Sequence, residues 1–506
     1  MLISLFSQEL LFFTVVVPFV FVYLCYRSSS ISKNTSAHAT NWPIFHMLPA
    51  LIVNLYNIHD CIAAVLAQNS QNTRIHLPGR RIFMTCDPAN VRHIFTTNYT
   101  NFPKGMEFAA IFDIMDRTLF TIDGEPARRQ RAKLQSVLSS PQLVASMAAC
   151  CRNKLENGLL PFFTDMASTN APFDMQEVIS RFIFDLAAMP IFGVDPGLVS
   201  SDMLSVEVAM AMDTVMEVGF IRHMMPDFCW KAMRRLNIGP ERKLHAAHTV
   251  LQGFIKNMIE SKKIKGGCIC NREEQQGVDI LSSYVNDPDY SNDGLFRAML
   301  GFMFAGRDTI GTILPWIFYN LAQNPNIVSV IRNELSPIAS RKIGAGRGAI
   351  VIFEPEEIKS LVYLQATLFE TLRLYPPAPF ERKTVVADDI MPSGHKVKAG
   401  DTIFISVHSM GRMEDVWGKD CHDYNPYRWI SEDNKLCYVP SHKFLSFNSG
   451  PRTCLGKDIA IMQMKTVVAA VLWNFDMEVV QGQSIQPKMS CILHMKNGLI
   501  VKLKKR

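Results

Sequence analysis

Cys454 lies in a segment whose residue types could hold a metal-containing ligand. Residues 447–456 read FNSGPRTCLG and directly precede the helical pattern IAIMQMKTVVAAVL. A thiolate is stabilised at a helix N-terminus, and Gly450 and Gly456 would let the backbone pass close to a large flat group. Arg452 could pair with a carboxylate on that group. The combination suits a haem, although a single cysteine taken alone is more often a buried core residue.

A second segment could place polar side chains beside such a group. In FMFAGRDTIGTIL, Ala305 and Thr309 are four residues apart and share one face of a predicted helix. Gly306 has no Cβ, so a small molecule could approach there, and Asp308 adjoins Thr309. The other interpretation of Thr309 is a hydroxyl that bonds back to a carbonyl of its own helix. Pro315 is predicted to free a carbonyl and to kink or open the helix.

Two charged patterns are ambiguous without their neighbours. Glu370 and Arg373, in ETLR, share a helix face just before the helix-ending YPPAP. Alone, such a pair is an ordinary surface ion pair worth less than about 1 kcal/mol. The basic segment 123–135, DGEPARRQRAKLQ, could steer an acidic partner or could simply be a solvated helix face.

The composition excludes several classes of protein. The chain of 506 residues is 48% hydrophobic and 19% charged, which is typical of a globular protein with a large core. Its net charge of +6 is spread without a basic tract, which argues against nucleic-acid binding. Its 12 cysteines are too dilute for a disulfide scaffold, so we expect buried free thiols. No flavin or nicotinamide motif lies in the chain.

The N-terminus predicts a membrane anchor over residues 1–26. Residues 10–26 are uncharged and as a helix would reach roughly 25 Å. Glu9 precedes them and Arg27 follows, which by the positive-inside rule puts the rest of the chain in the cytosol. A cleaved signal peptide is the other interpretation. Residues 27–50 form a polar linker and proline hinge, and residues 51–506 form a single large domain.

The periodicity of residues 51–506 predicts a mainly α fold with small β-sheets. Apolar residues recur at helical spacing over most of this length. Strands are expected at 82–86, within 395–406 and around 498–503. The charged, glycine-rich stretches 262–277 and 341–349 are predicted to be surface loops.

The pattern FxxGxRxCxG, complete at residues 447–456, resembles the signature of the cytochrome P450 superfamily. The resemblance implies the P450 fold and a membrane-anchored haem-thiolate monooxygenase of the endoplasmic reticulum. Cys454 would be the axial ligand of a haem b iron. Phe447, Gly450, Arg452 and Gly456 would complete the haem site. O2 would be the cosubstrate, and NADPH would supply electrons through a separate reductase, NADPH-cytochrome P450 reductase.

The other patterns gain roles from the same resemblance. Ala305 and Gly306 would face the haem, and Asp308 and Thr309 would relay protons to bound dioxygen. ETLR would be a buried pair, joined by Arg428 of the downstream segment PYRW, in which Tyr427 replaces the usual glutamate. Arg131 would hold a haem propionate. Ala127 stands where the family has a second propionate donor, tryptophan, and Arg128 or Arg129 could substitute; with Lys133 they would also form a reductase-docking patch.

Longer strings such as ETLRLYPPAPFERK and GRMEDVWGKDC resemble the plant clan that hydroxylates fatty acids and long-chain alkanes, which also includes phenol-coupling enzymes of alkaloid biosynthesis. The implied substrate is small and hydrophobic. Candidate pocket residues are apolar: Phe108, Ile111, Phe112, Met115, Phe220, Phe228, Phe302, Met303 and the segment 378–380 with Ala378 and Phe380. The intact AGRDT segment favours oxygen insertion over phenol coupling. A peroxide-rearranging haem enzyme and a haem-binding protein without turnover are the remaining alternatives.

Overall fold

A computed structural model describes residues 57–506 except 78–79, 199–206, 268–278, 286, 289 and 345–349. The predicted anchor and hinge, residues 1–50, lie outside the described residues. None of the described helices is long and apolar enough to cross a membrane. The cysteines in the described part are free thiols, but only Cys86, Cys150, Cys151 and Cys421 are buried as expected.

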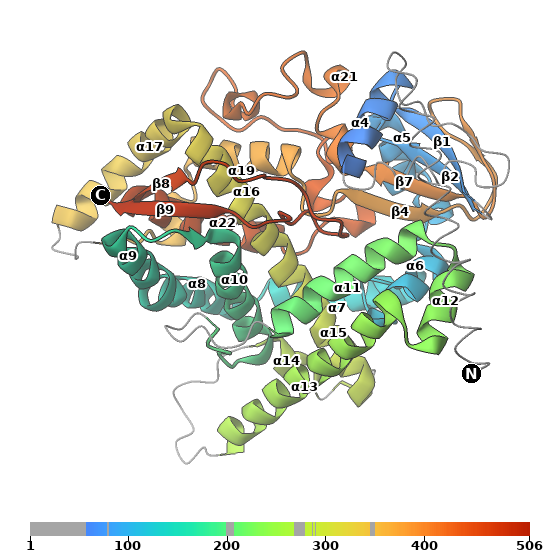
Figure 1. The fold of residues 1–506 in the computed structure, drawn as a ribbon, viewed down its shortest axis with the longest axis horizontal. Helices are drawn as coiled ribbons and strands as arrows, with labels where there is room; N and C mark the ends of the chain where they lie inside the picture. The colour runs from blue at the N-terminus through green and yellow to red at the C-terminus, as the bar shows by residue number, and fades with distance from the viewer. Residues whose placement is uncertain are drawn as a thin grey trace, which may run out of the picture.

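The chain is mainly helical with small sheets, as predicted (Figure 1). The helices are α4 (Ile58–Gln68), α5 (Pro88–Arg92), α6 (Gly105–Ile111), α7 (Gly124–Leu138), α8 (Pro141–Lys154), α9 (Leu160–Thr169), α10 (Met175–Phe192), α11 (Glu207–Met224), α12 (Asp227–Leu236), α13 (Gly239–Gly267), α14 (Ile280–Tyr284), α15 (Asn292–Met303), α16 (Thr309–Gln323), α17 (Pro325–Gly344), α18 (Pro355–Ile358), α19 (Val362–Leu374), α20 (Val407–Met410), α21 (Glu414–Trp417) and α22 (Lys457–Asn474). Short 3₁₀ or π turns connect several of them.

Three small sheets accompany the helices. The largest has the strand order β1 (Asn72–Leu77), β2 (Arg80–Thr85), β7 (Thr402–Ser406) and β4 (Phe380–Thr384). The others are β3 (Phe173–Asp174), β9 (Ile500–Lys505) and β8 (Phe475–Val479), and the pair β5 (Asp389–Ile390) and β6 (Lys396–Val397). The strands expected at 82–86, within 395–406 and around 498–503 are therefore confirmed.

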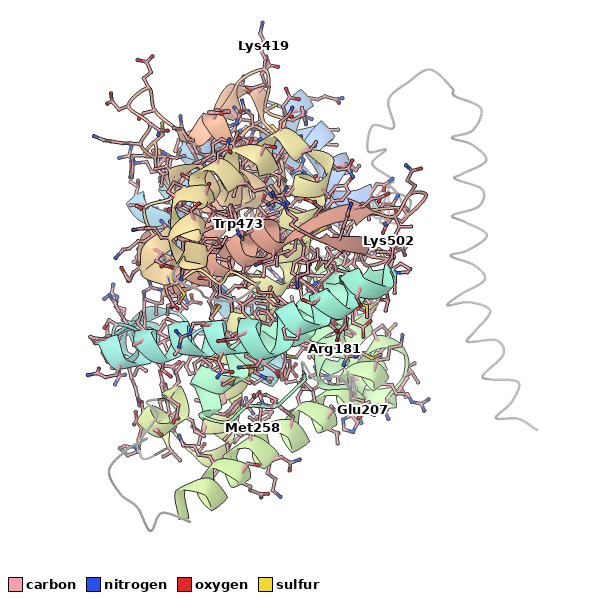
Figure 2. The ribbon with its side chains drawn as sticks, turned by 90° about the vertical axis from the view of Figure 1, so that its left-hand side faces the viewer. Arg181, Glu207, Met258, Lys419, Trp473 and Lys502 are labelled. Atoms are coloured by element: carbon pink, nitrogen blue, oxygen red, sulfur yellow. The ribbon has the colours of Figure 1, made fainter. Side chains whose placement is uncertain are left out.

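Helix α10 lies in the middle of the helical part. Its residues are buried on several faces, since it packs against α8, α15 and α16. In Figure 2, Arg181 of α10 lies between Trp473 and Lys502 on one side and Met258 of α13 on the other. A helix buried over most of its surface needs a largely apolar sequence, and MQEVISRFIFDLAAMPIF provides one.

The structure corrects one expectation about helix ends and shows that the helix does not end at Pro315. Helix α13 continues to Gly267 and α17 to Gly344, so the predicted loops at 262–277 and 341–349 begin later than expected. Helix α16 runs through Pro315 without ending. The departure from regular α-helix lies ahead of it instead, in the π-helical turn Phe304–Asp308 (η7) between α15 and α16. Such turns often occur at functional sites.

Candidate active site

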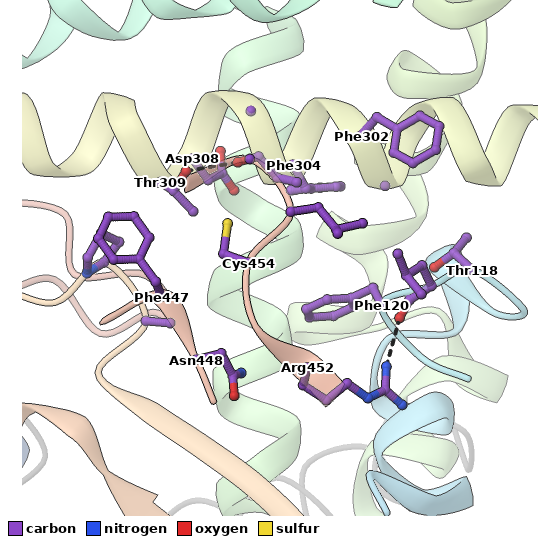
Figure 3. Close-up of a pocket in the computed structure, with 18 of the residues that line it drawn as sticks. Thr118, Phe120, Phe302, Phe304, Asp308, Thr309, Phe447, Asn448, Arg452 and Cys454 are labelled. Atoms are coloured by element: carbon purple, nitrogen blue, oxygen red, sulfur yellow. Dashed lines mark hydrogen bonds between the residues drawn. The ribbon is translucent and has the colours of Figure 1, made fainter. Parts of the chain in front are cut away.

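A large cavity brings the sequence motifs together. Its volume is about 740 Å³, and it is lined by residues of η7, α16, α6, α7, β4 and the segment ahead of α22. Figure 3 shows the Cys454 sulfur pointing across the cavity toward the turn that carries Asp308 and Thr309. Phe447, Arg452 and Gly456 also line the cavity.

The loop ahead of α22 is held by its own backbone. The Cys454 amide donates a 2.8 Å hydrogen bond to the Phe447 carbonyl. Gly450 has φ +57°, and a Cβ there would lie 2.1 Å from the Phe95 carbonyl oxygen. Gly450 is thus required by the protein chain, not by a ligand as the sequence suggested. A Cβ on Gly456 would meet no protein atom within 4 Å, so Gly456 leaves open space at the cavity wall.

The expected stabilisation of a thiolate is only partly present. Burial raises the pKa of the Cys454 thiol, while an N–H of Gly456 and the charges of Arg131 and Lys457 act in the opposite direction. Cys454 precedes the first residue of α22 by three positions. The protein by itself therefore favours the thiol, and a metal ion would be needed to hold the thiolate.

Arginines surround one end of the cavity. Arg452, labelled in Figure 3, donates to the Leu119 carbonyl at 3.1 Å. It also donates to the Asp123 carboxylate at 2.7 Å and to the Tyr99 hydroxyl at 3.2 Å. Arg131 donates to the backbone carbonyl of Thr453, one residue before Cys454. Both arginines line the cavity, as expected of groups that would hold a carboxylated ligand.

Two buried lysines join this cluster, and the sequence did not single them out. Lys104 lines the cavity, and burial lowers its pKa to about 7. Burial also lowers the pKa of Lys383 to about 8. Both interact with Arg452 and with the carboxylates of Glu381 and Asp123. Since the cations outnumber the carboxylates, a ligand with anionic groups fits this end of the cavity. The two propionates of a haem satisfy that requirement, and Cys454 faces the same cavity.

The two arginines proposed to replace the missing tryptophan differ in their position relative to the cavity. Ala127 is buried and lines the cavity. Both arginines are exposed on α7. Arg128 pairs with Glu125 at 3.6 Å and lines the cavity, whereas Arg129 is not among the lining residues. Lys133 pairs with Asp287, so it is not a free member of a surface patch. A helix presents successive residues to different faces, so Arg128 stays a candidate for the missing contact and Arg129 does not.

Thr309 fits both roles that the sequence left open, a hydroxyl at the ligand site and a hydroxyl bonded to a carbonyl of its own helix. Its hydroxyl donates a 2.8 Å hydrogen bond to the Ala305 carbonyl, and it also lines the cavity. Gly306 lines the cavity too, but a Cβ there would lie 3.2 Å from the Cβ of Ala187. The missing side chain of Gly306 therefore serves close packing against α10 rather than ligand access alone.

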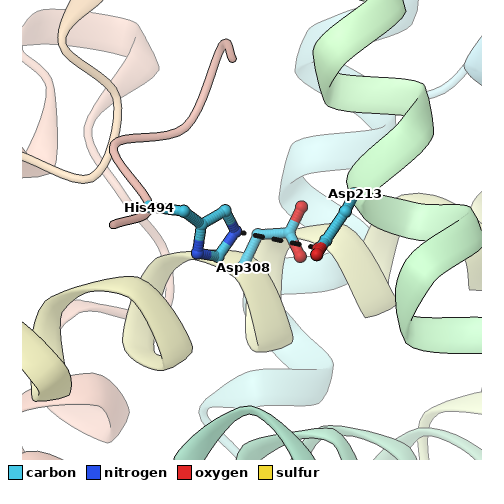
Figure 4. A group of neighbouring side chains, drawn as sticks. All are labelled: Asp213, Asp308 and His494. Atoms are coloured by element: carbon cyan, nitrogen blue, oxygen red, sulfur yellow. Dashed lines mark ion pairs between the residues drawn. The ribbon is translucent and has the colours of Figure 1, made fainter. Parts of the chain in front are cut away.

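Asp308, the expected partner of Thr309 in the proton relay, is buried. Arg307 donates to Asp308 at 2.8 Å and to Asp213 of α11 at 2.5 Å. Oδ2 of Asp308 has no hydrogen-bond partner in the described part of the chain, and burial raises the pKa of Asp308 to about 6. Figure 4 shows His494 beside the two carboxylates. The guanidinium between the carboxylates makes this group an ion-pair network rather than a metal site.

The ETLR pair is buried, as the resemblance implied. Arg373 donates to the Glu370 carboxylate at 2.7 and 2.8 Å, and both side chains are 0% exposed. Trp429 donates to Glu370 at 2.9 Å, whereas Arg428 approaches it only to 3.5 Å and bonds mainly to Asp420. This network ties α19 to the segment ahead of the cysteine loop.

Most candidate pocket residues line the cavity, and three do not. Phe108, Phe112, Met115, Phe220, Phe302, Ala378 and Phe380 line it. Ile111 and Met303 are buried in a hydrophobic core instead, and Phe228 is 73% exposed on α12. On short irregular helices the side-chain direction depends on exact register, which the sequence pattern does not determine. The lining residues Phe304, Phe404, His223 and Arg382 were missed.

Comparison with known proteins agrees with this geometry. A family model of cytochrome P450 matches residues 38–503. The alkane hydroxylase MAH1 of Arabidopsis thaliana is 34% identical, covering 92% of this chain and 93% of that protein. A noroxomaritidine synthase of Narcissus aff. pseudonarcissus MK-2014 is 35% identical over 94% of this chain and 93% of its own length. Cytochrome P450 86B1 of Arabidopsis thaliana is 34% identical over 91% and 85%.

The chain belongs to the cytochrome P450 family. It is accordingly a monooxygenase, and it depends on a haem iron, O2 and electrons that a reductase takes from NAD(P)H.

Proposed function

We propose that this monooxygenase inserts one oxygen atom from O2 into a long apolar substrate, a long-chain alkane or a fatty acyl compound. The observation that carries the proposal is the cavity itself, whose wall near Cys454 and Thr309 is dominated by aromatic and aliphatic side chains. Such a surface suits a hydrocarbon chain. The likeness to the alkane hydroxylase MAH1 supports the same substrate class.

The site residues have distinct roles in this proposal. Cys454 would hold the haem iron, and Arg131, Arg452 and Lys104 would hold the propionates, with Lys383 adding a positive charge behind them. When bound, the haem supplies the redox chemistry that activates O2.

The chain's own part in the reaction is to position substrate and protons. The phenylalanines of the wall orient the substrate and exclude water. Thr309 holds a proton at its hydroxyl at the cavity surface, and the carboxyl group of Asp308, whose pKa is raised to about 6, would take up and release a proton next to it. Solvent protons would reach Asp308 from the side of Asp213, whose side chain is 31% exposed.

We also propose where the enzyme acts. Residues 1–26 would form a single-pass anchor in the endoplasmic reticulum membrane, residues 27–50 a hinge, and residues 51–506 a catalytic domain on the cytosolic side. The uncharged segment 10–26, followed by Arg27, supports this arrangement. Arg128 and Arg129, exposed on α7, would face an acidic surface of NADPH-cytochrome P450 reductase.

A mixed-substrate turnover tests the proposal. The full-length protein in microsomes, with plant reductase and NADPH, is offered a long-chain alkane, a fatty acid and a phenolic amine, and mass spectrometry identifies the products. One added oxygen on a lipid supports the proposal. Loss of two hydrogens from the phenolic amine, without added oxygen, would replace it by oxidative coupling. Absence of NADPH consumption would indicate a haem-binding protein without turnover.

A further inference from the structure

Arg382 is a buried cation in the cavity wall that neither the haem site nor the proton path requires. It lies on β4, opposite Phe404 of β7, and both residues line the cavity. Only 3% of Arg382 is exposed. A guanidinium carries five N–H donors and keeps its charge at every physiological pH. The cavity wall therefore contains a fixed positive charge among aromatic rings.

The donors of Arg382 are not all used. Nη2 donates to the Glu107 carboxylate of α6 and approaches the Thr402 hydroxyl at 3.4 Å. Nε and Nη1 have no hydrogen-bond acceptor among the described residues. A buried donor without an acceptor is unfavourable, because nothing replaces the hydrogen bond that it makes to water when exposed. An acceptor brought by a ligand would remove that penalty.

The charge of Arg382 is also poorly balanced. Glu107 is its only close carboxylate among the described residues, and that side chain is 49% exposed and so screened by water. Arg80 adds a second positive charge nearby, and it is already paired with Asp227. His223 lines the same cavity, and burial with the charge of Arg382 lowers its pKa to about 3, so it is neutral. This part of the wall attracts anions and repels cations.

We propose that Arg382 binds the carboxylate of a long-chain fatty acid whose alkyl chain extends along the cavity toward Cys454. The inference rests on the proposed function and narrows its substrate class. The incoming carboxylate would replace that of Glu107 on the guanidinium, because Glu107 is half exposed and can return to water. An alkane would leave Nε and Nη1 without acceptors, and a protonated amine would be repelled. Anchoring one end fixes which carbon lies at the reacting position.

The test compares three ligands of equal chain length: palmitate, methyl palmitate and hexadecane. Dissociation constants are measured by isothermal titration with the full-length haem-loaded protein in lipid nanodiscs. Arg382→Met should weaken palmitate binding by about tenfold to a hundredfold, as expected for loss of a charge-assisted hydrogen bond. Hexadecane binding should change less than about twofold. Glu107→Gln, which removes the competing carboxylate, should strengthen palmitate binding.

Control variants separate a binding role from a loss of folding. Arg81→Met removes a cation that is 56% exposed and paired with Asp401, and it should leave the palmitate-to-hexadecane ratio unchanged. Should Arg382→Met not fold, Arg382→Lys replaces it, because lysine keeps a positive charge at the site. Arg382→Lys should lower the affinity for palmitate relative to that for hexadecane, but by less than complete loss of the anchor would. An unchanged ratio in the folded Arg382 variant, or weaker palmitate binding by Glu107→Gln, would overturn the proposal.

Turnover of the same three ligands distinguishes failure of the proposed function from failure of the proposed role of Arg382. If a lipid still gains oxygen while the affinity ratio is unchanged, Arg382 is not the anchor and the proposed function stands. If none of the lipids gains oxygen, the proposed function fails, whereas the binding measurement still decides the role of Arg382.

Discussion

Arg307 donates a 2.5 Å hydrogen bond to Asp213, which links the π-helical turn at the cavity to α11. The same Nη1 donates to Asp308, so one guanidinium connects a carboxylate that is 31% exposed with one that is 1% exposed. Ser180 of α10 accepts from the other terminal nitrogen of Arg307. Three helical segments therefore share one buried cation, directly beside Thr309.

The raised pKa of Asp308 predicts a pH-dependent stability. Because the folded-state pKa is raised from 3.8 to about 6, folding favours the protonated carboxyl. That contribution is fully present below about pH 4 and is lost as the pH rises through about 6. Thermal unfolding of Asp308→Asn and of the unaltered protein should therefore diverge between pH 4 and 7. We expect the Asn variant to gain up to about 3 kcal/mol relative to the unaltered protein.

Comparing these two proteins separates the titration of Asp308 from that of its neighbours. Burial lowers the pKa of His494 to about 4. The charges of Arg307 and His494 lower the pKa of Asp213, although its burial acts in the opposite direction. His494 and Asp213 are present in both the variant and the unaltered protein. A stability difference that is independent of pH would mean that Asp308 stays ionised, and it could not then carry a proton.

Glu370→Ala is predicted to be strongly destabilising. The substitution leaves the Arg373 guanidinium, which is 0% exposed, without its carboxylate, and loss of one partner of a buried pair costs about 3 to 5 kcal/mol. Thermal unfolding and the yield of folded protein measure the effect. Glu356→Ala is the matched control, because Glu356 is 85% exposed and its pair with Lys359 spans 3.7 Å, so less than about 1 kcal/mol is expected. Equal effects would contradict a structural role for the buried pair.

Two glycine substitutions in the cysteine loop should impair different properties of the protein: one should lower its stability and the other its haem content. Gly450→Ala places a Cβ 2.1 Å from the Phe95 carbonyl at a positive φ, so the loop must distort and the unfolding temperature should fall. Gly456→Ala meets no protein atom within 4 Å and should fold normally. Its methyl group would nevertheless occupy the cavity wall, so haem content should fall at an unchanged yield of folded protein. Full haem content in Gly456→Ala would contradict the placement of the haem against this wall.

The sequence predicted the fold class and the motifs well, because both depend on local patterns. Helical periodicity and the FNSGPRTCLG segment are readable in a single stretch of chain, and Cys454, Thr309 and Arg131 do line one cavity. The burial of Glu370 and Arg373 was expected from resemblance, since spacing alone favoured a surface pair.

What the sequence missed depends on side-chain direction and on distant contacts. Lys104 and Lys383 are 279 positions apart in numbering, and only the packing of α6 beside β4 brings both to the same cluster. Arg382 and Lys383 are adjacent, yet Arg382 lines the cavity while Lys383 lies over the Phe95 ring, as alternation along a strand requires. Ile111 also lies away from the cavity because of side-chain direction, here set by its position on helix α6.

The measurement that tests the account most directly is the reduced CO difference spectrum of the full-length protein and of Cys454→Ser. If Cys454 is the axial ligand, the unaltered protein shows the thiolate-type band and the Ser variant lacks it. Cys491→Ser is the control, because Cys491 lines the same cavity and should leave the band intact. A thiolate-type band that persists in Cys454→Ser would contradict the assignment of the haem ligand, and with it the site described for this chain.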